Sequence, residues 1–386
     1  MTRSRDHEWW IGALRNAPLF GPIVLLFLLM LMFTFLAPNT FWTVGNFKNV
    51  LVQNSVMAIL GIGLTLVILL GQIDLSFPGI VMVSAASVGL FYSGTKVGLP
   101  IFGNVSIGTN NQLVAILAAV AIGVILGILN GVMIAGVGVP SFIGSLGVLL
   151  LAEGWAYYWL NGQAAYSFPP WIISLGRGSW GPVPVIVICA LVVAGATHLM
   201  LRKTIFGRYI YMTGANRNAA RLSGVNTARV TMIVYVLAGL LAAVAGMAYA
   251  GNLASVNGTS GEELLLPTFA AVVLGGNSLF GGSGGVTNTL TGVLLYGILQ
   301  DGLLLVNLNI FLLPLLEGVL VVVAVVLNVG LGRLARIAAS RAGPGSSGRS
   351  NRVQAMKTSL RPGSETEGWE VGAGEIPEQH GSVTEE

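Results

Sequence analysis

Four carboxylic acids lie within or beside long apolar stretches of this sequence, and they are the residues that could carry charge-dependent chemistry: Asp74, Glu153, Asp301 and Glu317. An ionised side chain at the centre of a bilayer costs about 3 kcal/mol on insertion scales, so each carboxyl group must face protein, water or the membrane interface. Buried carboxylates of this kind mark ion sites, proton relays and polar-solute pathways. A single carboxylate such as Glu153 does not make a relay.

Asp74 lies in a segment that breaks a helix twice. Gly71 precedes it and the Pro78-Gly79 pair follows it, while the Ser76 side chain could cap the helix that restarts. Backbone groups freed by such a break inside a membrane must line a cavity or be buried in protein. Two interpretations follow: the segment is part of a gate or a polar-solute pathway, or Asp74 and Ser76 cap two helix ends at the cytoplasmic surface.

Enzyme signatures are missing from the sequence. Lys203-Thr204 and Lys357-Thr358 lack the preceding glycines of a phosphate-binding loop. The three histidines fit no metal-ligand spacing, and a single cysteine, Cys189, cannot form a disulfide within the chain. The sequence predicts no catalytic residue, metal site, cofactor or ATPase of its own. Uphill work would then need an ion gradient acting through the carboxylates, or a partner.

The composition predicts that these residues are held by membrane helices. Of 386 residues, 54% are hydrophobic and only 9% are charged, whereas soluble domains carry about a quarter charged residues. The predicted surroundings are membrane lipids, not nucleic acid. The apolar stretches have the length of helical spans, about 17 to 25 residues, and not that of barrel strands. The candidate spans are 19–37, 50–70, 79–95, 112–136, 141–160, 183–201, 229–251, 267–279, 288–306 and 310–328.

The positive charges predict the orientation. Lys and Arg concentrate before the first span, in the loop 202–229 and after the last span, and such residues favour the cytoplasmic side. Six crossings before the loop and four after it satisfy all three constraints. The predicted fold is an all-α integral membrane protein with about ten transmembrane helices and both termini inside. Its helices are broken or short near 71–79 and 267–285.

The chain divides into three predicted parts. Residues 1–18 form a cytoplasmic segment, and residues 19–330 form the transmembrane domain with its cytoplasmic loop 202–228. Residues 331–386 are rich in Gly, Ser, Pro and charge, which predicts a disordered cytoplasmic tail. The basic half of this tail either rests on anionic lipid or is unselective.

A parallel internal repeat is a further expectation. The spans 50–70 and 267–279 both run inward in this topology, and each ends in a glycine-containing break that is followed by a return helix. Repeats of this kind are common in transporters.

The loop 202–229 is the most polar internal segment. It is long enough for two short helices joined at a turn, with Asn216 as the N-cap of the helix 217–222 and Gly224 as its end. The loop either presents a docking helix to a soluble motor, or its arginines only enforce the topology.

Residues 204–225 resemble the cytoplasmic coupling loop of ABC-type monosaccharide importer permeases, the ribose/xylose/arabinose group. The resemblance continues through 71–76, Asn130-Gly131, 139–147 and 270–282, and order and spacing hold from about residue 45 to 330. The matching loop residues are Gly207, Arg208, Gly214, Asn216, Ala219, Ala220, Ser223, Gly224 and Val225.

This resemblance implies a permease subunit of an ATP-binding-cassette importer in the bacterial inner membrane. The subunit would be a homodimer with two ATPase subunits bound at 207–225, and a periplasmic or lipid-anchored binding protein would deliver the sugar. The expected ATPase-coupling residues are Gly207, Arg208, Gly214, Asn216, Asn218, Ala219, Ala220, Arg221, Ser223 and Gly224. The expected pathway or gate residues are Gly71, Gln72, Asp74, Ser76, Asn130, Gly275, Gly276 and Asn277.

The sequence also departs from the family pattern. Leu265 and Pro267 replace a Glu and an Asp that many members have, and Glu153 stands where an Arg is common. These changes weaken any inference about which sugar is carried. The rival hypothesis is an ion-coupled secondary transporter or channel, which would need Asp74 or Glu153 to bind the coupling ion.

Overall fold

The computed structural model describes residues 21–93, 96–99, 103–106, 110–259 and 261–306, with isolated residues between 312 and 326. The predicted N-terminal segment 1–18, the tail 331–386 and Glu317 lie outside the described residues, as does most of the predicted span 310–328.

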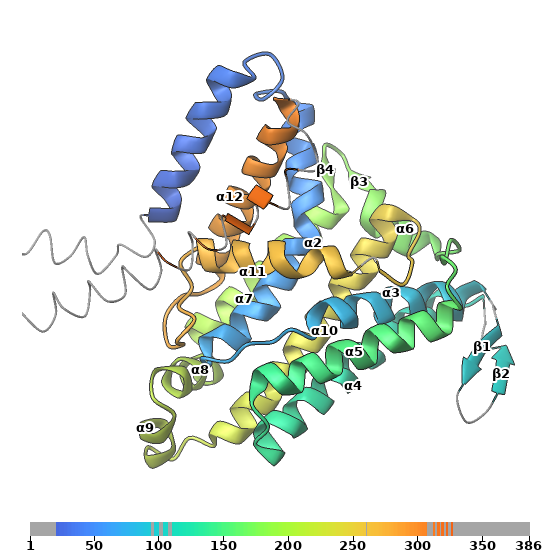
Figure 1. Cartoon of the computed structure of the whole chain (residues 1–386), viewed down its shortest axis with the longest axis vertical. Helices are drawn as coiled ribbons and strands as arrows, with labels where there is room; N and C mark the ends of the chain where they lie inside the picture. The colour runs from blue at the N-terminus through green and yellow to red at the C-terminus, as the bar shows by residue number, and fades with distance from the viewer. Residues whose placement is uncertain are drawn as a thin grey trace, which may run out of the picture. The chain divides into compact units, whose positions relative to one another are not determined.

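Helices make up most of the described part (Figure 1). The first nine predicted spans each coincide with a helix, and the two short helices expected in the loop 202–229 are both present. The helices are Gly21–Leu36, α2 (Val44–Leu69), α3 (Phe77–Ser93), α4 (Gln112–Gly131) with the π-helical turn η1 (Val132–Val137), α5 (Ser141–Leu160), α6 (Pro170–Arg177), α7 (Val185–Lys203), α8 (Ile205–Ala215), α9 (Arg217–Leu222), α10 (Thr227–Leu253), the 3-10 turn η2 (Glu262–Leu264), α11 (Leu265–Leu274) and α12 (Val286–Leu305).

Length and composition qualify four of the described helices as membrane-crossing by themselves: α2, α4 with η1, α7 and α10. Gly21–Leu36 and α3 are apolar but shorter. The structure therefore supports an all-helical, multi-pass protein.

Three small elements were not expected from the sequence. Helix α6 has eight residues, and two antiparallel hairpins pair β1 (Lys96–Leu99) with β2 (Gly103–Ser106) and β3 (Ser179–Trp180) with β4 (Val183–Pro184). Helix α6 and the β1–β2 hairpin lie in connections between the predicted spans, where the hydropathy pattern carries little information, and the β3–β4 hairpin takes up the first two residues of the predicted span 183–201.

Helix α2 lies at the centre of the helical packing. Every residue from Asn54 to Leu69 is buried, and α2 contacts α10, α12, α7 and α11. A helix that is apolar on all sides belongs in the interior of a bundle. The C-terminal end of α2, where the first predicted break begins, is therefore held by several neighbours.

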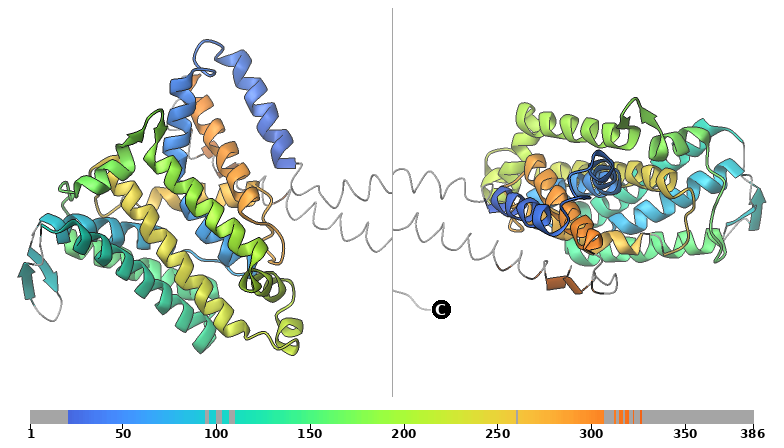
Figure 2. Two further views of the ribbon diagram at one scale, coloured as in Figure 1. Left: turned by 180° about the vertical axis from the view of Figure 1, so that it is seen from behind. Right: turned by 90° about the horizontal axis from the view of Figure 1, so that it is seen from above.

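Helix α10 packs on α4 through direct backbone contact, and the two run side by side in Figure 2. A Cβ atom added to Gly127 would lie 2.6 Å from the carbonyl oxygen of Tyr235, and one added to Gly239 would collide with the carbonyl oxygen of Gly123. Gly123 and Gly127 are four residues apart, and small residues at this spacing permit close approach between membrane helices.

The α4–α10 contact predicts that Gly127→Ala destabilises the protein. The added methyl group has no room against the α10 backbone, and overpacking of this kind costs about 1–3 kcal/mol. Thermal unfolding of the detergent-solubilised protein measures the effect. Gly195→Ala on α7 is the matched control, because nothing lies within 4 Å of its added Cβ. Equal unfolding temperatures for the two variants would contradict the prediction.

Candidate translocation gate and coupling site

The first break follows α2 directly. Gly71 adopts a left-handed conformation with φ +71°, and the chain then runs without helical structure until α3 begins at Phe77. Two hydroxyl groups of α5 satisfy its backbone: the Ile73 N–H donates to Ser141 Oγ at 3.2 Å and the Leu75 N–H donates to Ser145 Oγ at 3.0 Å. The freed backbone is thus partnered inside the protein, as a membrane break requires.

Asp74, Ser76 and Asn130 form one buried hydrogen-bonded cluster. Asp74 is 3% exposed, and its Oδ1 accepts hydrogen bonds from the Ser76 N–H at 2.8 Å and the Ser76 hydroxyl at 2.6 Å. Asn130 Nδ2 of α4 donates to Ser76 Oγ at 2.7 Å. The carboxylate of Asp74, and not the hydroxyl of Ser76, therefore accepts the backbone N–H just before α3. This N–H belongs to Ser76, which lies outside α3, and both side chains are buried and not at an exposed surface.

Two hydrogen-bond acceptors in and beside this cluster have no partner among the described residues. Asn130 Oδ1 and Gln72 Oε1 are buried and accept no hydrogen bond from the described residues. No cationic side chain acts on Asp74 in the part of the chain that the structure describes.

The second break follows α11 and is closed by Asn277. The Asn277 side chain accepts from the Gly285 N–H at 2.8 Å and donates to the carbonyl oxygen of Val272 at 2.9 Å and to Thr289 Oγ1 at 3.1 Å. The hydroxyl of Thr289 in turn contacts the hydroxyl of Thr65 on α2. Asn277 therefore folds the loop and ties it to α2.

Gly275 and Gly276 belong to this second group and not to the Asp74 cluster. A Cβ on Gly275 would collide with the carbonyl oxygen of Asn288 on α12, and Gly276 has a left-handed φ of +90°. The predicted gate residues thus form two separate groups, one at each break. The first group directly follows the end of α2, and the second is connected to α2 through the contact between Thr289 and Thr65.

The other carboxylates are placed apart from these groups. Asp301 on α12 accepts a hydrogen bond from Asn46 Nδ2 at 2.7 Å, near the start of α2. Glu153 is partly exposed on α5. Neither residue joins Asp74.

The predicted docking helix is present as α9. Asn216 Oδ1 accepts from the Ala219 N–H at 3.0 Å and caps α9, as the sequence predicts. Gly224 follows the helix with a left-handed φ of +82°. Helices α8 and α9 lie on the opposite side of the described part from the β1–β2 hairpin and α6 (Figure 1).

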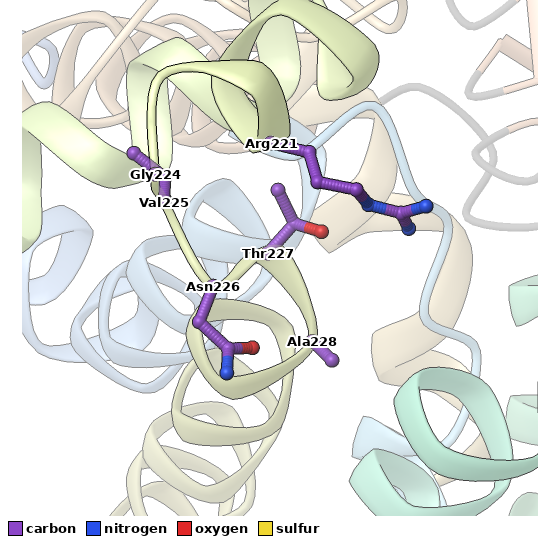
Figure 3. Close-up of a pocket in the computed structure, with 6 residues that line it drawn as sticks. All are labelled: Arg221, Gly224, Val225, Asn226, Thr227 and Ala228. Atoms are coloured by element: carbon purple, nitrogen blue, oxygen red, sulfur yellow. The ribbon is translucent and has the colours of Figure 1, made fainter.

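The exposed face of α9 is accompanied by a shallow hollow. This hollow has a volume of about 340 Å³ and leads from α9 to the start of α10 (Figure 3). Leu222, beside it in sequence, is 91% exposed, although the sequence analysis did not single it out. The sequence feature that could have identified Leu222 is its position between Ala219-Ala220 and Ser223-Gly224, which belong to the pattern shared with the permease family. The lining residues are Arg221, Gly224, Val225, Asn226, Thr227 and Ala228.

The predicted coupling residues divide by exposure. Gly207 and Ala220 are buried and Gly214 is partly buried, so their contacts are with this chain. A Cβ on Gly207 would collide with the backbone of Leu201 at the end of α7. The exposed members are Arg208, Asn216, Asn218, Ala219, Arg221, Ser223 and Gly224.

Comparison with known proteins identifies the family of the chain. A family described as the permease component of branched-chain amino acid transport systems matches residues 46–328. The ribose import permease protein RbsC of Escherichia coli (strain K12) is 36% identical over 313 residues, which cover 79% of this chain and 92% of RbsC.

Two further relatives carry the names of other sugars. The fructose import permease protein FrcC of Rhizobium meliloti is 29% identical over 83% of this chain and 88% of its own length. The galactose/methyl galactoside import permease protein MglC of Haemophilus influenzae is 30% identical over 75% of this chain and 88% of its own. No solved structure matches the chain. The chain therefore belongs to this family of transport-system permease components, and it is a multi-pass permease subunit of an ATP-binding-cassette importer in the bacterial inner membrane.

Proposed function

We propose that this chain forms the translocation pathway for a monosaccharide and works as a homodimer. Two ATP-hydrolysing subunits bind on the cytoplasmic side, and a periplasmic or lipid-anchored binding protein delivers the sugar from outside. The observation that carries this proposal is the exposed helix α9 with its adjoining hollow, on a chain that aligns with nearly the whole length of a ribose import permease. The family description mentions amino acids, but the individual relatives named above are sugar permeases, which favours a sugar.

We propose the ten-helix topology with both termini inside. In this topology the connections 70–76, 138–140, 204–226 and 275–285 fall on the cytoplasmic side. Contacts within the chain support it, because Ser141 bonds to the first break and Gly282 bonds to Leu69.

Contacts on the opposite side support the same topology. Ala165 forms a bridge with Val256, and Arg177 donates to the carbonyl oxygens of Asn252 and Leu253. These residues lie in or beside the connections 161–184 and 254–264, which the topology places outside. We also keep the three-part division: a cytoplasmic segment 1–18, a transmembrane domain 19–330 and a cytoplasmic tail 331–386.

The docking surface is formed by α9 and the start of α10. Leu222 offers an apolar side chain, and Arg217 and Arg221 flank it with positive charge. An exposed apolar residue with arginines nearby in the same helix fits the composition of protein interfaces, in which Arg is enriched. A soluble ATPase subunit with a matching groove would bury Leu222.

The gate is formed by Asp74, Ser76 and Asn130. Their hydrogen bonds join the break after α2 to α4, and the serines of α5 hold the adjacent backbone. Separation of α4 or α5 from this segment would expose the Asp74 carboxylate and the Asn130 amide to a passing solute. The break thus serves as a cytoplasmic gate that closes when the helices meet.

The docking proposal predicts that Gly224→Trp and Ala219→Glu lower the association with the ATPase subunit by about tenfold or more, because both changes fall on the centre of the surface. Co-purification with candidate ATPase subunits measures this. The matched control is Gly181→Trp, since Gly181 also has a left-handed φ, +60°, and open space around its added Cβ. Equal loss in both tryptophan variants would argue against a specific docking site.

The energy source is tested by uptake into vesicles. Vanadate, which blocks ATP-hydrolysing subunits, is expected to stop uptake of a radiolabelled pentose or hexose, whereas an ionophore is not. Uptake that collapses with the ionophore and ignores vanadate would establish the ion-coupled alternative.

The variant Asp74→Asn distinguishes two roles for this residue: a gate needs its hydrogen-bond acceptor, whereas an ion site needs its negative charge. The asparagine Oδ1 can still accept both hydrogen bonds from Ser76, so vanadate-sensitive uptake is expected to persist, reduced by about tenfold at most. Asp74→Leu, which removes the acceptor, is expected to abolish uptake. If Asp74→Asn instead abolishes uptake completely, the carboxylate charge is required and the ion-coupled mechanism gains support.

A further inference from the structure

Three backbone segments from distant parts of the sequence meet where the two breaks contact each other. They are the end of α2 at Leu69 to Gly71, the end of α8 at Gly214 to Ala215, and the loop at Gly281 to Gly282. The Gly282 N–H donates to the carbonyl oxygen of Leu69 at 2.9 Å. A Cβ on Gly214 would collide with that same carbonyl oxygen and would lie 2.8 Å from the nitrogen of Gly282.

We call the set Gly71, Gly214, Gly281 and Gly282 the glycine junction. A Cβ on Gly281 would lie 2.6 Å from the nitrogen of Gly71 and 2.9 Å from the carbonyl oxygen of Gly214. One added to Gly282 would lie 2.8 Å from the Cα of Ala215. No side chain separates the three segments. Because packed protein interiors compress little, a displacement of α8 must move both of its neighbours.

A hydrogen bond from the Tyr211 side chain also joins α8 to the loop 275–285. Tyr211 lies on α8 one turn before Gly214, and its hydroxyl donates to the carbonyl oxygen of Gly284 at 2.9 Å. Burial is the main influence on the Tyr211 phenol and raises its pKa, so the hydroxyl stays protonated and remains a donor at neutral pH. The next residue, Gly285, donates its N–H to Asn277 Oδ1.

The junction is therefore connected to both groups of gate residues. Gly71 is followed within the same break by Asp74 and Ser76, which bond to each other, and Ser76 also accepts a hydrogen bond from Asn130. Gly284 and Gly285 are followed by Thr289, which bonds to Asn277 and contacts Thr65 on α2. In the other direction, α8 continues into α9, with Asn216 between the two helices.

We propose that the glycine junction, secured by the Tyr211–Gly284 hydrogen bond, transmits the movement of the docking helix α9 to both helix breaks. This inference rests on the proposed function of α9. Tyr211 and Gly214 are positioning residues: they contact no solute and act by fixing α8 against α2 and the loop 275–285.

The test is Tyr211→Phe in the full complex of permease, ATPase and binding protein, with Tyr158→Phe as the control. Tyr158 is an exposed tyrosine on α5, outside the loop 202–228. For Tyr211→Phe we expect unchanged co-purification with the ATPase, while uptake per ATP hydrolysed falls by about three- to tenfold, the effect of losing one hydrogen bond. Tyr158→Phe is expected to match the wild type in both measurements.

A purely structural role gives a different result. Tyr211→Phe would then lower the yield of assembled complex or its unfolding temperature and leave uptake per ATP unchanged, and this outcome overturns the junction proposal alone. Failure of the wild-type chain to bind any ATPase subunit overturns the proposed function, and the junction proposal with it. Gly214→Ala is the second variant: it is expected to reduce uptake per ATP more than Tyr211→Phe, because the methyl group presses directly on Leu69.

Discussion

The need to satisfy backbone polar groups where membrane helices are interrupted governs this structure. Residues of both breaks are buried between helices, where an unpaired N–H or carbonyl group costs several kcal/mol. The break after α2 meets the need with the hydroxyls of Ser141 and Ser145, and the break after α11 meets it with the side chain of Asn277. In both cases the partner side chain is short and polar. The breaks are stable because neighbouring helices deliver these groups to them.

Close backbone contact is the second consequence of building a bundle around interrupted helices. Glycine permits it at several places, among them the contact between α4 and α10 at Gly127 and the junction around Gly214. The first contact joins two long helices along their length, which favours rigid-body movement of the pair. The second brings three backbone segments together at one point. This favours transmission of a movement from one segment to the others. The same residue type thus serves packing in one place and mechanical connection in another.

Much of the helical framework was predictable because hydropathy and helix-cap chemistry are local. The apolar lengths placed α2, α4, α7 and α10, and the Asn216 cap placed α9. The cluster of Asp74, Ser76 and Asn130 was anticipated only as a set of residues. Its members lie far apart in the sequence, and only the packing of α4 against the break brings Asn130 to Ser76. Helix α6 and the hairpins escaped prediction because short polar connections carry little periodic signal.

By itself the sequence determined the class of protein, the positions of the long apolar helices that the structure describes and the residue types available at each break, because these depend on composition and on neighbouring residues. The tertiary structure decided which distant residues meet. That Leu69, Gly214 and Gly282 share one point, and that Tyr211 reaches Gly284, follows from how the helices cross. The crossing depends on side-chain shape across many contacts at once. No local pattern in a single sequence encodes it.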